Sequence, residues 1–281
     1  MTGGTGGQPQ GSNNLHNADR LGKPYLCRVA CLFYALQANR KNCRRSKGQL
    51  KCKNGGKEAR QRETAKGKRF RKNLVELLQN NPYPGRGIVV GKDRVYYWIM
   101  GRSTNSRNRV FTLTDDGIRT EAHDPSLLED PSLIIYHPVR TMGDKLVVTN
   151  GDQTDTIVEA GDFRAGCMKR EYEPDAPNFT PRISAVINED GSFEISILKH
   201  GAGDRCQREF FAYEGADEGT GYFISTYQGD GNPLPTFAGE PIEVSMPEPA
   251  EVWAALNADN KVSLYCNVAG EVSIFNKNLG D

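Results

Sequence analysis

The chain has 281 residues with a hydrophobic content of 37%, and its formal net charge of +1 conceals two parts of opposite charge. Residues 1–72 carry 18 lysines and arginines against 3 acidic residues, a net charge of +15, whereas residues 73–281 carry 18 against 32, a net charge of −14. No apolar run approaches the roughly 20 residues of a membrane-spanning helix, so we expect no membrane partner and a globular core in the acidic part.

The seven cysteines indicate neither a disulfide framework nor a zinc module. Four lie in the basic part at intervals that differ from the paired C-x2-C spacing of zinc sites, and no histidine lies among them. The other three, Cys167, Cys206 and Cys266, are widely scattered. We therefore expect a cytoplasmic protein without a structural metal.

Residues 1–71 are predicted to be a basic, largely disordered extension. The first 14 residues are rich in Gly, Gln and Asn, and residues 40–72 are dense in lysine and arginine, which leaves little apolar surface to bury. The apolar run at 25–36 is interrupted by Arg28 and fits a signal peptide poorly, while an organellar transit peptide stays open. Nucleic acid is an open partner for this extension, because clustered cations bind phosphates without sequence preference.

The acidic part, residues 72–281, is predicted to begin with a short helix and a β-hairpin. The leucines at 74, 77 and 78 share one helical face, and the sequence NNP ends that helix. A strand at 88–90 and the apolar run VYYWIM at 95–100 then pair through a turn at 91–94.

Residues 101–109 read GRSTNSRNR and contain three arginines without any acidic residue. They stand between two apolar runs, which predicts a polar loop between two strands. Arginine binds phosphate or carboxylate bidentately, and hydroxyl and amide side chains add further donors, so a phosphate ester is the natural ligand. The alternative is the solvated end of a hairpin.

The next segments predict strands that end in polar residues. A strand at 110–114 precedes a turn at 115–117 and a polar connection through His123, after which a strand at 132–140 carries Tyr136. Another strand starts at 145 and runs into Asn150-Gly151-Asp152, where Thr154 and Asp155 are expected to cap a helix.

The C-terminal half continues this pattern. A hairpin turns at 189–191, the strand that starts at 222 ends in a glycine-rich loop at 228–232, and a helix at 250–257 precedes strands at 261–268 and 272–275. Roughly ten strands, few helices and no long βαβ alternation predict an α+β fold with mostly antiparallel sheets.

Four stretches together resemble, in this order, the archaeal-type IMP cyclohydrolase family and its bacterial cyclohydrolase-like relatives: WIMGRSTNSRNRVF, VVTNGDQTDTI, YEPDAPNFTPRIS and STYQGDGNPLP. The resemblance covers residues 73–275 and leaves the basic extension unexplained. It implies two stacked, mostly antiparallel sheets between helical layers, similar to the N-terminal-nucleophile hydrolases but without the processed nucleophile. Residues 84–87, which lead into the first strand, accordingly contain no Ser, Thr or Cys.

The resemblance also implies a reaction. The family closes the purine ring of 5-formamidoimidazole-4-carboxamide ribotide to give IMP and water, the last step of purine synthesis. This chemistry needs a base for the carboxamide nitrogen, a donor for the formyl oxygen and an acid that helps expel water. Both reacting groups lie on one imidazole, so we expect no cofactor and no metal.

Residues in the four stretches are assigned to these needs by the resemblance. Arg102, Tyr136 and Glu173 are the expected catalytic residues, with Arg102 near the reacting centre or the phosphate. Asn105, Ser106 and Arg107 lengthen the arginine loop relative to the archaeal form, so the arginine that binds phosphate is open. The expected substrate-binding residues are Ser103, Asn105, Arg107, Asn108, Arg109, Asn150, Asp152, Asn178, Arg182, Gln228, Asp230 and Asn232.

Two other functions stay open at this point. Besides IMP formation, the first alternative is a cyclohydrolase-like enzyme for a related nucleotide, and the second is a noncatalytic protein that binds a purine nucleotide. The expected partner is a small ribonucleotide in every case, and a homo-oligomer is also open.

Overall fold

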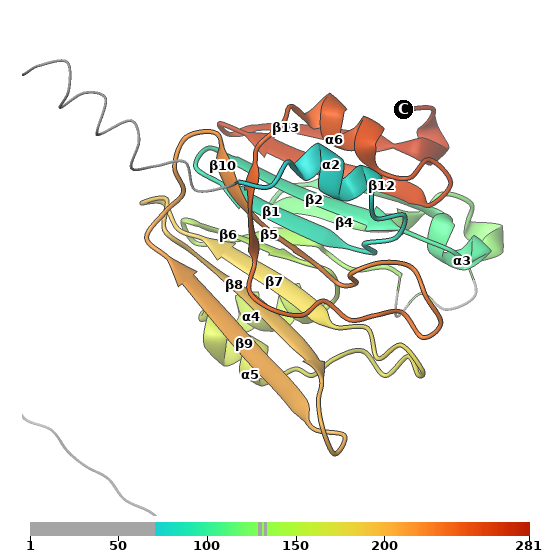
Figure 1. The fold of residues 1–281 in the computed structure, drawn as a ribbon, viewed down its shortest axis with the longest axis horizontal. Coiled ribbons are helices and arrows are strands. Elements are labelled where there is room, and N and C mark those ends of the chain that lie inside the picture. The colour runs from blue at the N-terminus through green and yellow to red at the C-terminus, as the bar shows by residue number, and fades with distance from the viewer. Residues whose placement is uncertain (1–70, 129–130, 132–133) are drawn as a thin grey trace, which may run out of the picture. The chain divides into compact units, whose positions relative to one another are not determined.

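The computed structural model in Figure 1 describes residues 71–128, 131 and 134–281 of the chain. All of these residues belong to one compact unit. The predictions for the basic extension, including the apolar run at 25–36, lie outside the described residues. No helix in the described part of the chain is long and apolar enough to cross a membrane.

The described strands form two sheets in which all neighbouring strands are antiparallel. The first sheet has the order β11-β10-β1-β2-β12-β13 and the second the order β3-β4-β5-β6-β7-β8-β9. The first sheet contains β1 (Gly87–Gly91), β2 (Arg94–Met100), β10 (Thr220–Ser225), β11 (Ile242–Ser245), β12 (Lys261–Val268) and β13 (Glu271–Asn276). The second contains β3 (Arg109–Thr114), β4 (Gly117–Ala122), β5 (Val139–Met142), β6 (Lys145–Thr149), β7 (Arg182–Ile187), β8 (Phe193–His200) and β9 (Cys206–Tyr213).

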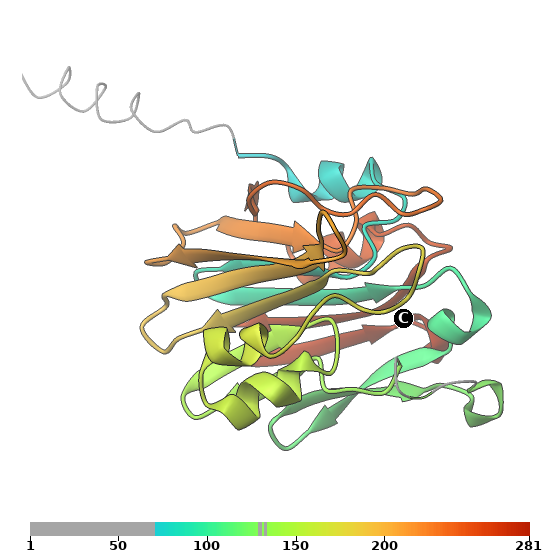
Figure 2. The same cartoon turned by 90° about the horizontal axis from the view of Figure 1, so that it is seen from below.

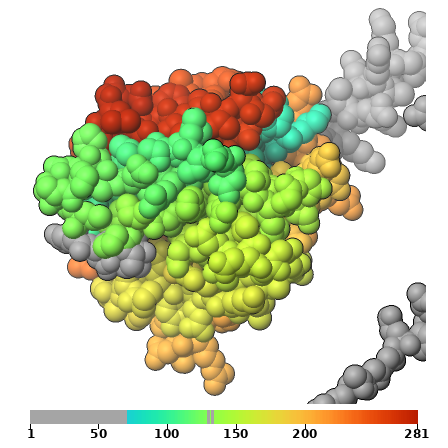
Figure 3. All heavy atoms as spheres, turned by 180° about the vertical axis from the view of Figure 1, so that it is seen from behind, coloured from blue at the N-terminus to red at the C-terminus, as the bar shows by residue number. Residues whose placement is uncertain are grey.

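The described helices are α2 (Leu74–Gln79), α3 (Thr104–Arg107), α4 (Gln153–Ala160), α5 (Phe163–Met168) and α6 (Pro249–Ala255), with 3-10 turns at Pro125–Leu127 and Lys277–Leu279. Helices α2 and α6 cover the outer face of the first sheet and α4 and α5 that of the second, whereas α3 lies in the connection between β2 and β3. Figure 2 shows α2, in cyan, and the α4–α5 pair, in yellow-green, on opposite sides of the sheets. In the view from behind, the α4–α5 region lies next to the green β3–β4 region on one face (Figure 3).

Three hydrophobic clusters hold these layers together. One lies between the sheets, the second packs the first sheet against α2 and α6, and the third packs the second sheet against α4 and α5. Successive side chains of a strand point to opposite faces, so Tyr97 and Ile99 enter the inter-sheet core while Trp98 and Met100 pack toward the helices. Because both faces of β2 are covered, its sequence is a continuous apolar run rather than an alternating one.

Most of the sequence-based predictions for this part of the chain are confirmed. The structure contains the α+β antiparallel architecture, the helix α2, the β1–β2 and β7–β8 hairpins, the helix α6 and the two final strands. Asn73 caps α2 by accepting a hydrogen bond from the backbone N–H of Val75 at 2.9 Å.

The arginine stretch at 101–109 is not the end of a hairpin, so that alternative is wrong. β2 belongs to the first sheet and β3 to the second, and the connection between them crosses from one sheet to the other. It contains the one-turn helix α3, where Ser103 and Ser106 each bond the backbone N–H of the other. A polar sequence is needed here because the crossing leaves backbone groups outside both sheets.

Three local predictions were wrong. Residues 117–122 form β4 and not a polar connection, since Ile118 and Thr120 alternate into the core. The strand predicted at 132–140 begins only at Val139, because Pro138 has no N–H to donate; Tyr136 precedes the strand, and its carbonyl accepts from Thr120 N at 2.9 Å.

The predicted caps of the following helix were also wrong. Helix α4 begins at Gln153, so Thr154 and Asp155 lie inside its first turn, where Thr154 Oγ1 bonds Thr149 Oγ1 at 2.6 Å and Asp155 pairs with Arg140. The sequence patterns also missed α5, β9 and β11, which are short or lack a clean alternation.

Candidate active site

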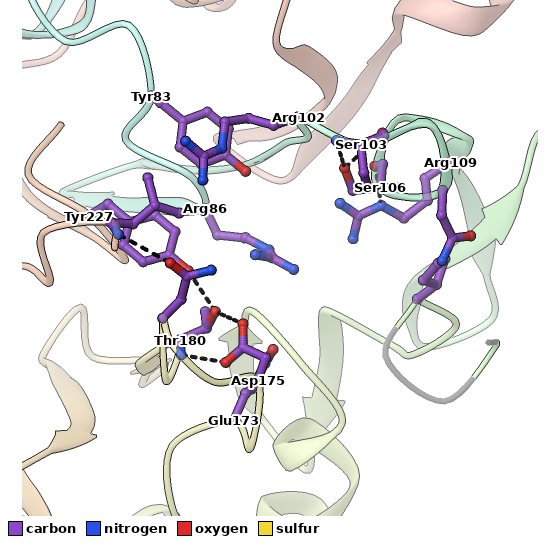
Figure 4. A pocket seen from close by; sticks show the side chains of 14 residues that line it. Tyr83, Arg86, Arg102, Ser103, Ser106, Arg109, Glu173, Asp175, Thr180 and Tyr227 are labelled. Carbon is purple, nitrogen blue, oxygen red and sulfur yellow. Dashed lines mark hydrogen bonds between the residues drawn. The ribbon is translucent and has the colours of Figure 1, made fainter. Parts of the chain in front are cut away.

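A pocket of about 340 Å³ lies at one end of the two stacked sheets (Figure 4). β1 begins at this end, and its two antiparallel neighbours β2 and β10 finish there, since Gly87 faces Trp98 on one side and Ser225 on the other. β3 and β7 of the second sheet also begin at the pocket. Segments that are distant in sequence therefore bring their polar ends to one cavity.

Arg109, the first residue of β3, is buried in the pocket wall with only 1% of its surface exposed. Its Nε donates to the carbonyl of Ser106 at 2.9 Å and a terminal nitrogen to the carbonyl of Met100 at 3.5 Å. Within the described residues it forms no ion pair with a carboxylate. Burial and the nearby Arg86 cation lower the pKa of Arg109, as expected for a positive charge that has no acidic partner.

Arg86 enters the pocket from the segment that leads into β1. The preceding Gly85 has a φ of +72°, and a Cβ there would lie 2.3 Å from Thr226 Oγ1, so only glycine permits this backbone course. Arg86 N donates to Thr226 Oγ1 at 3.1 Å, which fixes the segment on the loop after β10. The Nε of Arg86 is buried and has no hydrogen-bond partner.

The charge of Arg86 is supported from across the pocket. Burial alone would lower the pKa of Arg86, but the Glu173 carboxyl and, after it, the Tyr136 phenol raise it above its ordinary value. The described part of the chain contains no carboxylate within ion-pair distance of either Arg86 or Arg109. Two guanidinium groups that face one cavity without such a partner form a site for an anionic ligand.

Glu173 is the buried acid of the pocket, with 6% of its surface exposed. Burial raises the pKa of its carboxyl, although Arg86 and Arg182 oppose this shift. A Cβ on Gly151 would lie 2.5 Å from Arg182 Nη1 and 3.4 Å from Glu173 Oε1, so the absence of a side chain lets the two groups approach. A carboxyl whose pKa is raised by burial holds a proton more readily than an exposed one, which suits it to proton transfer.

Tyr136 is almost fully buried and is not among the residues that line the pocket. Its hydroxyl and that of Tyr97 are 3.0 Å apart, and either can be the donor. Burial, followed by the neighbouring Tyr136, raises the pKa of Tyr97, so the Tyr97 phenol remains protonated. The phenol of Tyr136 also acts electrostatically on both Arg86 and Arg109.

Arg102 lies at the rim of the pocket, and 38% of its side chain is exposed. Its Nη1 donates to Asp230 Oδ1 at 2.6 Å and to the carbonyl of Gly231 at 3.1 Å. Its guanidinium lies 5.0 Å from the centre of the Tyr83 ring, as Figure 4 also shows. Arg102 thus joins the β2–β3 connection to the glycine-rich loop after β10.

The pocket brings together six of the fifteen residues singled out from the sequence, and the roles of all fifteen stay predictions. Those that line it are Arg102, Ser103, Asn105, Arg109, Glu173 and Asn178. Asp230 is held at the rim by Arg102, whereas Arg182 and Asp152 pair with each other at 2.8 Å behind Glu173. Gln228 and Asn232 belong to the loop after β10 and do not line the cavity.

Three of the remaining predicted ligand residues are bonded to the protein itself. Arg107 donates to the Gly101 carbonyl and to Asn260, and Asn108 exchanges two hydrogen bonds with the backbone of Asp124. Asn150 donates to the Pro181 carbonyl and accepts from Ile183 N. These side chains satisfy backbone groups that the loops leave unpaired.

Sequence reasoning missed several residues of the wall, namely Tyr83, Arg86, Asp175 and Tyr227, and assigned no role to Ser106. One signal for Arg86 was present, because a single arginine stands between two glycines directly before an apolar strand. Tyr83 and Tyr227 carried no such signal, since a tyrosine beside an apolar strand is more often a core residue. Among the described residues, no three His, Cys, Asp or Glu side chains gather as metal ligands.

Comparisons with known proteins point to one family. A family model described as IMP cyclohydrolase-like protein matches residues 83–271, a range that contains every segment of the pocket. The IMP cyclohydrolase of Methanosphaera stadtmanae is 32% identical over 161 residues, which cover 52% of this chain and 74% of that protein.

Two further relatives have the same name. The IMP cyclohydrolase of Methanococcus aeolicus is 27% identical, with coverage of 52% of this chain and 74% of that protein. That of Natronomonas pharaonis is 31% identical, with coverage of 56% and 78%. Since the family model spans most of the chain and these relatives align over about three quarters of their own length, the chain belongs to the IMP cyclohydrolase-like protein family.

Proposed function

We propose that this chain is an IMP cyclohydrolase, which closes the purine ring of 5-formamidoimidazole-4-carboxamide ribotide to give IMP and water. The observation that carries the proposal is the pocket, where two guanidinium groups without a bonded carboxylate, that of the buried Arg109 and that of the partly buried Arg86, share the cavity with the buried carboxyl of Glu173. The arginines suit an anionic ribotide, and the carboxyl suits proton transfer.

The phosphate of the ribotide is assigned to Arg109. This side chain is already held in place by the carbonyls of Ser106 and Met100, and Ser103 and Ser106 line the same part of the wall. A ligand phosphate compensates the charge of Arg109, which has no acidic partner among the described residues. Because the guanidinium is already held in place, it loses little side-chain entropy when the phosphate binds.

Arg86 is assigned to the reacting centre in place of Arg102. Glu173 and Tyr136 are the two groups that most strongly raise its pKa, whereas Arg102 is exposed and paired with Asp230. A cation that a carboxyl and a phenol stabilise in this way is suited to an oxygen that gains negative charge.

Ring closure balances with these groups alone. A bond forms between the carboxamide nitrogen and the formyl carbon, and the bond from that carbon to the formyl oxygen breaks. Glu173 takes one proton from the carboxamide nitrogen, while Arg86 and the Tyr97–Tyr136 pair stabilise the oxyanion. Glu173 returns this proton to the oxyanion, which becomes a hydroxyl group. Glu173 then moves the proton of the formamido nitrogen to that hydroxyl, so the oxygen departs as water while the double bond between the formyl carbon and this nitrogen forms.

The fold is proposed to be of the N-terminal-nucleophile-hydrolase type without the processed nucleophile. Two antiparallel sheets between helical layers support this, as does the sequence PGRG before β1, which has arginine where a nucleophile would be needed. The catalytic domain is proposed to be residues 72–281, with residues 1–71 as an extension. Deleting residues 1–70 should change kcat/KM by less than about twofold, and a large loss would disprove this boundary.

A cyclohydrolase-like enzyme for a related nucleotide is the second candidate. It is favoured by Asn105 and Ser106, which belong to the lengthened loop and line the pocket, so the insertion alters the wall itself. Asn105 Oδ1 is buried there without a hydrogen-bond partner. A purely noncatalytic binding protein gives no reason for the buried carboxyl of Glu173.

The test is direct. Purified protein is mixed with the formamido ribotide without added metal, and IMP formation is followed by ultraviolet absorbance. Thermal shift with a panel of ribotides runs in parallel, because at equal concentration a ligand that binds the folded protein more tightly raises the melting temperature more. Turnover supports the proposal, stabilisation by a different ribotide without turnover supports the second candidate, and neither effect in folded protein rejects both.

A further inference from the structure

A line of three hydrogen-bonded side chains forms the wall of the pocket opposite Arg109. Asp175, Thr180 and Tyr227 all line the cavity, and Figure 4 shows the bonds that join Asp175 to Thr180. Asp175 accepts from the backbone N–H of Thr180 at 2.6 Å and from its hydroxyl, and the Thr180 and Tyr227 hydroxyl oxygens are 2.5 Å apart.

The direction of these bonds follows from counting protons. An ionised carboxylate has no proton, so Asp175 can only accept, and both of its oxygens do so from Thr180. The single hydroxyl proton of Thr180 is therefore used. The contact between Thr180 and Tyr227 must then be donated by Tyr227, which leaves only lone pairs on the Tyr227 oxygen for any other partner.

The ring of Tyr227 is held in place, in addition to the direction in which its hydroxyl donates. Its ring stacks on Tyr83 with centroids 6.0 Å apart, and a Cβ on Gly85 would lie 2.6 Å from its Cδ2. Its backbone N–H donates to the Pro84 carbonyl at 3.2 Å. Burial raises the pKa of Tyr227 to about 12, so the phenol keeps the proton that it gives to Thr180.

We propose that Tyr227 is a specificity-determining residue that accepts a hydrogen bond from a donor group of the bound nucleotide, and that Thr180 and Asp175 are positioning residues that fix this polarity. The inference rests on the proposed function for the identity of the ligand. Two groups of a purine ribotide have the required chemistry, namely the ribose hydroxyls and the N–H groups of the base. A ligand that presents only an acceptor there leaves two lone pairs opposed and binds less tightly.

The experiment measures the affinities of IMP, 2′-deoxy-IMP and 1-methyl-IMP by calorimetry. The first analogue lacks a ribose donor and the second lacks the N–H of the base. Wild-type protein should prefer IMP by about tenfold over one of the two analogues, the loss expected for one buried hydrogen bond. The analogue that is rejected identifies the group that Tyr227 contacts.

The variants separate polarity from packing. Tyr227→Phe should reduce that preference below about threefold. Asp175→Asn keeps the shape of the side chain but donates an N–H to the Thr180 hydroxyl. Thr180 then donates its proton to Tyr227, and the Tyr227 hydroxyl donates its own proton into the pocket. The preference for IMP should therefore also be lost. Thr180→Ser keeps the hydroxyl and should retain it, and melting curves show that each variant is folded.

The double variant Asp175→Asn/Tyr227→Phe shows whether Asp175 acts through Tyr227. We expect it to match Tyr227→Phe alone. If wild-type protein bound IMP but Tyr227→Phe kept the full preference, or if the two changes were additive, the inference would be wrong while the proposed function stood. If wild-type protein bound none of the three nucleotides, the proposed function itself would fail, and with it the inference.

Discussion

Arginine reaches the pocket from two segments that hold it in different ways. Residues 84–87 carry one arginine between two glycines, and Arg86 is fixed there because its backbone packs on the loop after β10. Residues 101–109 carry three arginines with three different fates: Arg109 is buried at the pocket, Arg102 is paired at the rim, and Arg107 turns back to its own loop. An arginine that enters the pocket without an acidic partner is thus the better indicator of a ligand site. The number of arginines in a stretch of sequence does not identify such a residue.

The largest effect is expected at Glu173, the acid that Arg86 faces. Glu173→Gln keeps the shape but cannot take a proton, so kcat should fall by about 10³-fold, within the usual range for a general acid–base residue. Steady-state kinetics with the formamido ribotide provide the measurement. A loss below about tenfold would move the proton transfer to another group.

The same variant has a distinct pH signature in stability. Because burial raises the folded-state pKa of Glu173 above its ordinary value of 4.5, the folded protein binds that proton more tightly than the unfolded chain does. This contribution to stability is full below pH 4.5 and is lost as the pH rises through the folded-state pKa. Glu173→Gln should lack that loss in denaturant unfolding at a series of pH values, whereas Glu171→Gln, at an exposed neighbouring acid, should keep the wild-type profile.

The next largest effect concerns the fixed arginine of the first segment. Arg86→Met removes the charge that faces the reacting oxygen, so kcat should fall by about 10²-fold to 10³-fold while the affinity for IMP changes less. The split between kcat and affinity is the measurement that matters. Equal losses in both would place Arg86 at the phosphate and exchange its role with that of Arg109.

Within the second segment, Arg109 and Arg107 form a matched pair. Arg109→Met should lower the affinity for IMP by about 10²-fold and leave the weak binding of inosine unchanged, because only the phosphate contact is lost. Arg107→Met should keep the affinity for IMP within about threefold. It should instead lower the free energy of unfolding by about 1 kcal/mol, since its bonds to Gly101 and Asn260 are internal. The reverse pattern would assign the phosphate to Arg107.

The sequence was informative wherever burial follows a repeating pattern. The apolar runs at 88–90 and 95–100 predicted the β1–β2 hairpin, and the leucines at 74 and 78 predicted the buried face of α2. Tyr136 shows where such patterns fail to predict structure. It stands in an apolar run, but the strand begins only after Pro138, and the Tyr136 carbonyl accepts a hydrogen bond from Thr120 N of β4. Contacts between segments far apart in the chain are not encoded in local periodicity.

The candidate site was predictable as a set of segments but less so residue by residue. Polar motifs combine side chains that face the pocket with others that satisfy loop backbone, and both kinds use the same residue types. Asn178 lines the cavity and also accepts a hydrogen bond from Leu234 N at 3.1 Å, while Asn108 and Asn150 bond backbone groups of loops without lining the cavity. Composition cannot distinguish them, because the difference depends on which backbone groups the fold leaves unpaired.

The smallest effect is expected at Arg102, the exposed arginine of the rim. Its pair with Asp230 is 38% and 49% exposed at the two side chains, and such a pair contributes at most about 1 kcal/mol to stability. Arg102→Gln should therefore leave kcat within about twofold and raise KM by about threefold to tenfold, an effect that decreases at high salt.

Asp230→Asn is the informative comparison. If Arg102 leaves Asp230 to contact the ligand, removing the acid frees the arginine, and KM should stay constant or fall. If Arg102 only anchors the loop after β10, both variants should raise KM equally and the double variant should add nothing. We expect the first outcome, because an exposed guanidinium above Tyr83 can turn from the rim into the cavity at little cost.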